Sequence, residues 1–457
     1  MDRQPGNRAM RTLWLIIAIY VVCAGVVGWL MPWSSHDARW PEHLCSKYTP
    51  PDEYAHLAYV KYLFTHRALP LFDDPTGNYE AHQPPLYYAS CLPAYAIGSA
   101  MAESLGLADP DTGALLLIRV WSILIGGAMI WAVYLLGLRL FGNDHRKALM
   151  AAGFAGFLPM HLVNLAGITN DGLAELMVVL ATLAACRLAA EPSDRSALMM
   201  GIWSSLAILV KSNSLFLLVV GMGAALLATR EWRDEGVRLK VTGRYVGIFL
   251  GTIFVLCGWW WIRNQMLYGD PLAQKVFVEL FSIDRATPEW FFERGISGIG
   301  YLQMIAFGTA LSFWGVFGQA NVYMPEYFYL LGWGFTLAVI VGLVRSVRSE
   351  QKFWMGAAAC WLLVILSLGF VAAFYLRFNM IFYQVQARYL FTGIGPLAAL
   401  FVAGWWGLWS PGGAEELGVR CRCGWVLWWV ILGLLVGIAV YHLRSGAPCL
   451  VVPFVGG

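Results

Sequence analysis

The sequence predicts an all-α protein that crosses a membrane many times. Of its 457 residues, 59% are hydrophobic and only 13% are charged, whereas a soluble domain of this size carries about a quarter charged residues. Long apolar stretches recur along the chain, and a helix of about 20 apolar residues spans a bilayer. Lys and Arg gather in the segments between alternate pairs of these stretches. We therefore expect one polytopic domain over residues 1–457, built as a bundle of about 11–13 transmembrane helices.

The apolar stretches give about eleven candidate spans. They cover residues 12–31, 115–141, 148–168, 172–190, 197–210, 213–229, 244–262, 327–344, 353–376, 388–409 and 425–443, with a further stretch near 300–318. The first stretch lacks a small-residue cleavage site, so we expect it to remain as a membrane helix. No internal repeat of the kind that marks a two-halved transporter is visible.

The basic residues set the predicted orientation. They precede the first and last spans and follow the second, sixth and eighth: Arg3, Arg8, Arg11, Arg139, Arg146, Lys147, Arg230, Arg233, Arg238, Lys240, Arg244, Arg345, Arg348, Lys352, Arg420 and Arg422. Alternating spans put all these segments on one side, and the positive-inside rule makes that side, with the N-terminus, cytoplasmic. The outer, periplasmic face of the inner membrane then holds a first loop over residues 32–114 and a second large segment over residues 263–326.

Charge and cysteine content indicate no other class. The net charge of +3 is spread without a basic tract, so nucleic acid is not an expected partner. The nine cysteines are scattered, and several lie in apolar stretches, where cysteine packs as a small residue. Cys421 and Cys423 have the wrong spacing for a usual zinc pair and no second pair nearby.

The first outer loop begins with an acidic helix start, "TPPDEYAHLAYVKYLFTHRALP" at residues 49–70. Two prolines precede Asp52, where we expect a helix to begin. Apolar residues recur on one side of this segment, which predicts an amphipathic juxtamembrane helix lying on the membrane surface. Asp52, Glu53 and His56 fall within one helical turn and can address one spot. A simpler explanation is that acids at a helix N-terminus offset the helix dipole.

A second polar stretch in this loop reads "NYEAHQPPLYY", residues 78–88. Glu80, His82 and Gln83 precede a double proline that starts the next helix, in which Tyr87 and Tyr88 suit a membrane interface. Taken alone, this stretch is an ordinary helix start.

Together, "PDEYAH" and "HQPPLYY" resemble the first outer loop of the GT-C superfamily of polyprenyl-phosphate-dependent glycosyltransferases. The branch resembled is that of protein O-mannosyltransferases and the lipid A aminoarabinose transferase. Further stretches fit this group in the expected order: "GITNDGLAE" (167–175), "ILVKSNSLFLL" (208–218), "WWWIRNQMLYGDPLA" (259–273), "SFWGVFG" (312–318) and "QARYLFTGIGPLAAL" (386–400). Each motif is short, so their order and the topology carry the resemblance.

The resemblance implies a GT-C-like bundle and an integral-membrane glycosyltransferase. Such an enzyme takes a sugar from a polyprenyl-phosphate donor on the outer face of the membrane, among membrane lipids, and gives it to a glycan, lipid or protein acceptor. Two departures stand out. The aminoarabinose transferase has Lys directly before its Pro-Pro-Leu, where this chain has Gln83 after His82. The second departure is that we expect no large soluble outer domain after the last span.

Sugar transfer needs a base for the acceptor and groups that hold the leaving phosphate. Inversion in a single displacement needs no covalent intermediate. Asp52 matches the first acid of the family's pair and is the expected base. Glu53 is expected to support it by orienting the acceptor, a metal or His56.

Cations at predicted outer span ends are the candidates for the phosphate site: Arg388, Lys211 and Arg263. The alternative for each is ordinary interfacial placement of a long basic side chain. Asn170 and Asp171 lie in the turn between the third and fourth spans and either cap a helix or bind sugar, acceptor or metal. His82, Gln83 and Tyr87 complete the candidate binding residues.

Other features leave alternatives open. His161 and Glu175 lie within spans, where an ionisable residue is a functional suspect. A divalent metal is conceivable, because Asp52, Glu53, His56, His82 and Asp171 supply suitable ligands, but no cofactor is assigned. A transporter or flippase for lipid-linked sugars would place its charges near mid-membrane, and a non-catalytic scaffold of a glycan assembly complex would tolerate loss of Asp52. The concentration of acids in the first outer loop favours the enzyme.

Overall fold

The computed structural model describes residues 5–33, 51–72, 79–107, 109–283, 285–348, 357–409 and 419–445. Almost all of them are helical. The helices are α1 Pro5–Leu30, α3 Glu53–His66, η1 Tyr79–His82, α4 Leu86–Ser104, α5 Pro110–Leu140, α6 His145–Phe157, α7 Pro159–Ala166, α8 Asp171–Ala190, α9 Asp194–Val210, η2 Ser212–Phe216, α10 Leu217–Ala228, α11 Glu235–Tyr268, α12 Gln274–Phe281, α13 Pro288–Phe292, α14 Gly298–Gly315, α15 Glu326–Arg348, α17 Ala358–Asn379, η3 Ala387–Gly393, α18 Ile394–Trp409 and α19 Val419–Ser445. Within the described residues the only strands are β1 Val316–Phe317 and β2 Val322–Tyr323, which pair antiparallel.

Eight of the described helices are long and apolar enough to cross a membrane, and a ninth span results if α6 and α7 are counted as one. This count is lower than the eleven predicted from the sequence. The predicted span 148–168 is bent by 61° between α6 and α7, where Pro159 begins the second helix and cannot continue the hydrogen bonding of the first. The predicted spans 197–210 and 213–229 are short helices, α9 with 17 residues and α10 with 12.

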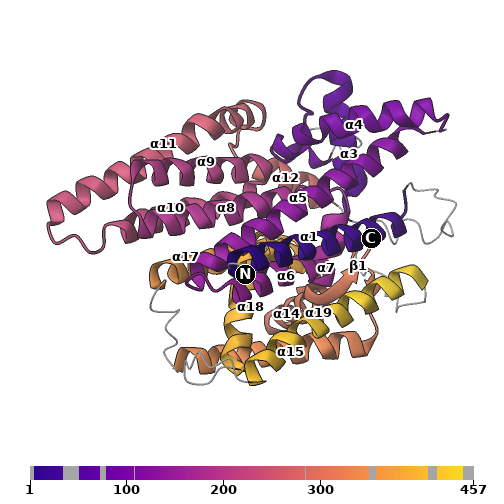
Figure 1. The fold of residues 1–457 in the computed structure, drawn as a ribbon. Coiled ribbons are helices and arrows are strands. Elements are labelled where there is room, and N and C mark those ends of the chain that lie inside the picture. The colour runs from indigo at the N-terminus through magenta and orange to yellow at the C-terminus, as the bar shows by residue number, and fades with distance from the viewer. Residues whose placement is uncertain are drawn as a thin grey trace.

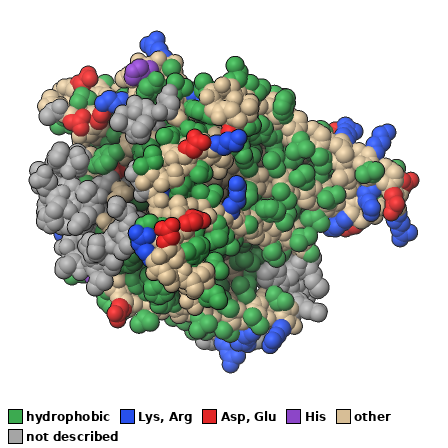
Figure 2. Space-filling model, turned by 180° about the vertical axis from the view of Figure 1, so that it is seen from behind, with side chains coloured by type: hydrophobic (Ala, Val, Ile, Leu, Met, Phe, Trp, Pro, Cys, Tyr) green, Lys and Arg blue, Asp and Glu red, His purple; other side chains and the backbone are tan. Residues whose placement is uncertain are grey.

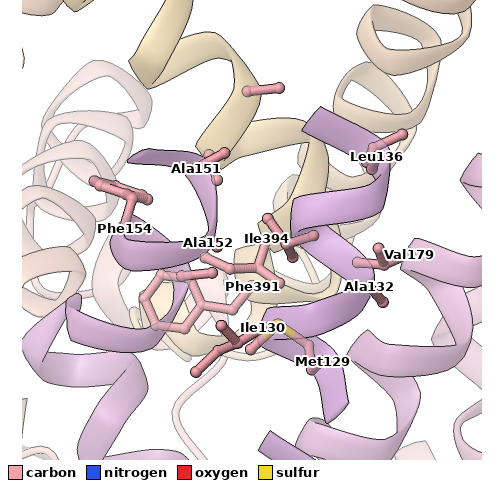
Figure 3. Close-up of a cluster of buried hydrophobic side chains, with 14 of the residues drawn as sticks. Met129, Ile130, Ala132, Leu136, Ala151, Ala152, Phe154, Val179, Phe391 and Ile394 are labelled. Carbon is pink, nitrogen blue, oxygen red and sulfur yellow. The ribbon is translucent and has the colours of Figure 1, made fainter. Parts of the chain in front are cut away.

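The helices form two groups around a shared centre (Figure 1). Helices α8, α9, α10 and α11 pack in succession on one side, and α15, α18 and α19 pack on the other. Helices α5 and α6 lie between them, α4 packs on α5, and α3 packs on α4. Most of the buried apolar residues form one large cluster. Figure 3 shows the part of it where Ile130 of α5, Phe154 of α6, Val179 of α8 and Ile394 of α18 meet.

Among the described residues, several segments predicted to be cytoplasmic contact one another. Arg139, near the end of α5, pairs with Glu191, just after α8, at 3.0 Å. Arg244 of α11 pairs with Asp194, the first residue of α9. In Figure 2, Lys and Arg side chains gather at the projecting tip and along the lower edge, and the surface between them is mainly hydrophobic. Large apolar side chains on the exposed face of α11, including Phe254 and Val255, suit contact with lipid.

The first outer loop differs from its prediction in one respect. Helix α3 exists close to its predicted start, but its first turn is buried: Glu53 is 1% exposed and His56 is 3% exposed. The first turn of α3 therefore packs into the bundle and is not the polar side of a surface helix. Residues 34–50 and 73–78 lie outside the described residues. They include four acids of the predicted outer loop, Asp37, Glu42, Asp73 and Asp74.

Candidate functional site

Asp52 is the residue before α3 and adopts a left-handed backbone conformation, with φ of 64°. Asp and Asn enter this region more readily than most residues. The Asp52 carboxylate makes no capping hydrogen bond to the helix, although it lies directly before α3, where an acid offsets the helix dipole. It accepts hydrogen bonds from Arg388 Nη2 at 2.6 Å and from the Tyr79 hydroxyl. Arg388 comes from η3, 336 residues further along the chain.

A second ion pair lies beside the first. Lys211, in the extended link between α9 and η2, pairs with Asp171, the first residue of α8. Asn164 Nδ2 donates a hydrogen bond of 3.2 Å to the other oxygen of this carboxylate. The Tyr389 ring lies 5.6 Å from the Lys211 ammonium and 5.2 Å from the Arg388 guanidinium. Tyr389 thus faces both cations, and the two ion pairs form one cluster, defined here as Asp52, Asp171, Lys211 and Arg388.

These groups remain charged at neutral pH. Burial alone would raise the pKa of Asp52, but the guanidinium of Arg388 and the hydrogen bonds from Tyr79 and Arg388 hold it well below its usual range. Burial likewise opposes the charge on Lys211, but Asp171 outweighs this effect and raises the lysine pKa. The cluster therefore contains two carboxylates and two cations.

His56 and His82 of the first outer loop are uncharged. Burial lowers the pKa of His56 to about 4 and that of His82 to about 4. His56 Nδ1 is hydrogen-bonded to the Tyr88 hydroxyl at 2.9 Å. His82 Nδ1 donates to the Tyr79 carbonyl at 2.9 Å, and its Nε2 lies 3.0 Å from Gln83 Nε2. Both ring nitrogens of His82 are therefore engaged, and the ring carries no charge.

Gln83 and Asn170 join the first loop to the bundle. Asn170 Nδ2 lies 3.3 Å from Gln83 Oε1 and also 3.3 Å from the Val210 carbonyl, next to Lys211. This small network ties the segment before α4 to the turn before α8 and to the end of α9. Its role in the structure is to hold three chain segments together at the edge of the cluster.

Glu53 points away from Asp52. Its carboxylate accepts hydrogen bonds from Arg119 Nε at 2.8 Å, from Arg119 Nη2 at 2.6 Å and from the Ile168 amide at 2.9 Å. Arg119 also donates to the Gly28 and Pro32 carbonyls, each at 2.8 Å. Both charged side chains are almost fully buried. Glu53 therefore links α3 to α1, α5 and the turn before α8, and it has no free oxygen for an acceptor.

Two further predicted residues lie outside the cluster. The Tyr87 hydroxyl is hydrogen-bonded to Ser122 at 3.0 Å in a buried position, and the neighbouring Tyr88 is the one that contacts His56. Arg263 Nη2 donates to the Pro70 carbonyl at 2.9 Å and its guanidinium lies over Trp260. Arg263 supports the end of the α3 segment.

His161 and Glu175 form a pair deeper in the bundle. His161 Nε2 and Glu175 Oε2 are 2.6 Å apart, and His161 Nδ1 donates to the Ala155 carbonyl at 2.6 Å. Both residues are inaccessible to solvent. Glu175 lies one helical turn beyond Asp171 on α8. The His161–Glu175 pair is therefore next to the cluster along α8.

The sequence assigned no role in the site to three residues of this region. Tyr79 and Glu80 lie in "NYEAHQ", and the sequence pattern indicates only a helix start for this stretch. Arg119 lies inside the predicted span 115–141, whose other cation, Arg139, is close to its end, and an ionisable residue inside a span is a recognised signal for a functional or structural role. It was available in the sequence.

The candidate metal ligands do not converge. In the described segments, no group of three or more His, Cys, Asp or Glu side chains is placed to hold a metal ion. Glu53 is bound to Arg119, and both nitrogens of His82 are engaged. The candidate ligands within the described segments therefore do not fit a divalent metal site.

Comparison with known proteins supports the GT-C resemblance. The sequence profile of the dolichyl-phosphate-mannose-protein mannosyltransferase family matches residues 113–261. No curated protein matches the chain.

Solved structures share the fold at low sequence identity. ArnT from Cupriavidus metallidurans bound to undecaprenyl phosphate is 14% identical, with a TM-score of 0.53 over 95% of this chain and 77% of that one. The Archaeoglobus fulgidus oligosaccharyltransferase with zinc and sulfate is 14% identical, with a TM-score of 0.52 over 94% of this chain and 53% of that one. A second structure of that archaeal enzyme, AglB with an inhibitory peptide and a dolichol phosphate, is 12% identical, with a TM-score of 0.50 over 94% and 56%. The chain thus spans about half the length of the archaeal enzyme, and its fold is that of the GT-C membrane glycosyltransferases, as the sequence predicted.

Proposed function

We propose that this protein is an integral-membrane glycosyltransferase that moves a sugar from a polyprenyl-phosphate donor to an acceptor at the outer face of the membrane. The observation that carries the proposal is the cluster of Asp52, Asp171, Lys211 and Arg388, which four separate segments bring together at one end of the bundle. The GT-C fold and the family profile over residues 113–261 support the same class.

In this proposal Asp52 is the general base. It removes the proton from an acceptor hydroxyl or amine, whose oxygen or nitrogen then attacks the anomeric carbon of the donor. The bond from that carbon to the phosphate breaks, and the polyprenyl phosphate leaves with its electron pair, so the configuration inverts in one step. The Asp52 side chain is 25% exposed whereas Arg388 is 5% exposed, which leaves the carboxylate accessible to an acceptor from the aqueous side.

Arg388 has two roles in this proposal. In the structure it neutralises Asp52, and a base with a strongly lowered pKa accepts a proton poorly. Arg388 binds the donor phosphate, and the phosphate draws the guanidinium away from Asp52. The pKa of Asp52 then rises towards its usual range, so donor binding makes the carboxylate a better base.

A cavity beside the cations, lined largely by aromatic side chains, suits the lipid chain of the donor. It is lined by Asn213, Phe216, Val371, Phe374, Tyr375, Phe378, Tyr389 and Thr392. Tyr389 belongs both to this lining and to the cluster. A polyprenyl phosphate placed with its phosphate at Lys211 and Arg388 would have its first isoprene units in this cavity.

The test is transfer by the Asp52→Asn variant. Asn tolerates the left-handed backbone conformation of residue 52, so this variant removes the base and preserves the local geometry. We expect the transfer rate from a synthetic polyprenyl-phosphate sugar to fall at least about a hundredfold. The matched control is Asp111→Asn, which removes an acid of the same loop whose partner, Lys61, is exposed. Full activity of Asp52→Asn would overturn the assignment of the base.

A flippase for lipid-linked sugars is the second candidate. It would move a labelled donor across a vesicle membrane without breaking the sugar-phosphate bond, and Asp52→Asn would retain this movement. The position of the cluster at one end of the bundle, rather than midway along broken helices, favours the transferase. A purified protein that moves the donor but never cleaves it would favour the flippase.

A further inference from the structure

Glu80 is a buried acid beside the cluster for which the proposed chemistry has no role yet. It lies in η1, directly after Tyr79, whose hydroxyl is bound to Asp52. The residue is 5% exposed, and among the described residues its Oε2 has no hydrogen-bond partner. A buried carboxyl oxygen without a partner carries a substantial free-energy cost. Such an atom is expected to gain a partner when the site is occupied.

The groups around Glu80 define what that partner is. Among the described segments, the charged and titratable groups near Glu80 come from several elements: Tyr79 and His82 of its own helix, Asp52 and Tyr59 at α3, Tyr88 of α4, Lys211 after α9, Arg285 after α12 and Arg388 of η3. Burial, and after it the negative charge of Asp52, raise the pKa of Glu80 to about 8, although Lys211, Arg388 and Arg285 act in the opposite direction. Glu80 is therefore a neutral acid at pH 7 and carries a proton that it can donate.

We propose that Glu80, as a neutral carboxylic acid, donates a hydrogen bond from Oε2 to an oxygen of the lipid phosphate held by Lys211 and Arg388. The inference rests on the proposed function and adds a binding residue to it. A neutral acid is the form that suits this position, because a carboxylate would face the phosphate as a second anion. No proton changes owner in this contact, so it assists departure of the phosphate without being the base.

Variants at position 80 separate the neutral acid from the carboxylate. Gln has the shape of Glu and a neutral donor, so Glu80→Gln should bind polyprenyl phosphate within about threefold of the unmodified protein. Glu80→Ala lacks the donor and should bind at least about tenfold more weakly, as expected for loss of a hydrogen bond to a charged group. Binding is measured with purified protein in lipid nanodiscs, with undecaprenyl phosphate as the probe, and Asp111→Asn serves as the control.

The pH dependence gives an independent readout. Glu80 loses its proton as the pH rises through about 8, so the unmodified protein should bind the probe about tenfold more weakly at pH 9 than at pH 7. Glu80→Gln has no proton to lose at this position and should lack most of this decrease. The phosphate itself is already doubly ionised over this range, since its second pKa is about 6.

Three outcomes of these binding measurements support or overturn the proposal. Retention in Glu80→Gln with loss of the decrease above pH 8 supports the proposal. Loss of binding in Glu80→Gln equal to that in Glu80→Ala, or an unchanged decrease above pH 8, overturns it while leaving the proposed function intact. Failure of the unmodified protein to bind the probe at any pH overturns the proposed function and this inference with it.

Discussion

At the scale of single residues, burial changes the charge state of the site more than the sequence suggests. His56 and His82 stay neutral down to about pH 4 in the folded protein, whereas a histidine in the unfolded chain takes up a proton at about 6.5. Between these values the unfolded state binds more protons, so stability rises with pH across this window and falls as the pH is lowered.

This gives a prediction for stability against pH. The midpoint of thermal unfolding in detergent should fall as the pH is lowered from 7 to 4.5, and His82→Gln should reduce that fall. His66→Gln, which changes an exposed histidine at the end of α3, should leave the slope unchanged. Equal slopes for His82→Gln and the unmodified protein would mean that His82 does not remain neutral in the folded state.

The pair of Glu53 and Arg119 gives a second prediction at this scale. Arg119→Met leaves a buried carboxylate without its cation, which costs about 3–5 kcal/mol in comparable pairs. Adding Glu53→Gln removes that uncompensated charge, so the double variant should be more stable than Arg119→Met alone. Thermal unfolding of Arg119→Met, Glu53→Gln and the double variant measures these differences. The control is Lys61→Met, which breaks an exposed pair and is expected to cost less than about 1 kcal/mol. A double variant as unstable as the sum of the single ones would show that the two side chains act independently.

At the scale of elements, close helix contact decides where the first loop can sit. Helices α4 and α5 cross at Gly98 and Gly113, where a Cβ on either glycine would overlap the backbone of the other helix. This contact holds α4 against α5. It therefore helps to position α3, which Asp52 precedes, and the part of α5 that carries Arg119.

A side chain at this crossing should therefore separate the two helices. We expect Gly98→Val to lower the free energy of unfolding by about 1–3 kcal/mol and to reduce transfer activity. Gly251→Ala is the control, because a Cβ at this glycine of α11 meets no atom within 4 Å. Stability of Gly98→Val equal to that of the control would contradict the crossing.

The element scale also shows how far the sequence could predict the site. The outer ends of the apolar stretches pointed to Arg388, Lys211 and Asp171, because alternating spans bring such ends together. Nothing in the local pattern specified that Arg388 would reach Asp52 across 336 residues, since pairing of distant side chains depends on how the whole bundle packs. Helix spacing allowed Glu53 to lie beside Asp52 and support it. In the structure, Arg119 of α5 binds the Glu53 carboxylate instead.

At the scale of the whole molecule, the fold class and most spans follow from hydropathy. The number of spans does not, because a bent pair such as α6 and α7 and a short helix such as α10 have the same apolar composition as a straight span. The buried start of α3 was equally invisible in the sequence. Its polar first turn looks like a solvated surface until its partners from other helices are known.

Orientation in the membrane is the prediction that belongs to this scale. A cysteine placed at Lys61, whose side chain is 51% exposed, should react with a membrane-impermeant maleimide in intact cells. A cysteine at Arg238, 46% exposed, should react only after the cells are opened. Both variants are made in a background whose other reactive cysteines are serine. The reverse labelling pattern would place the cluster on the cytoplasmic side.

The composition of the cluster also bears on how fast a donor arrives. Asp52 and Asp171 carry two negative charges, Lys211 and Arg388 carry two positive charges, and the neighbouring histidines are neutral. Balanced charges produce little field beyond a few ångströms, so they do not attract an anion over long distances. A lipid-borne donor would then reach the site by lateral diffusion in the bilayer. Its association rate should change little with ionic strength, unlike the rate of a water-soluble anion steered by an exposed basic surface.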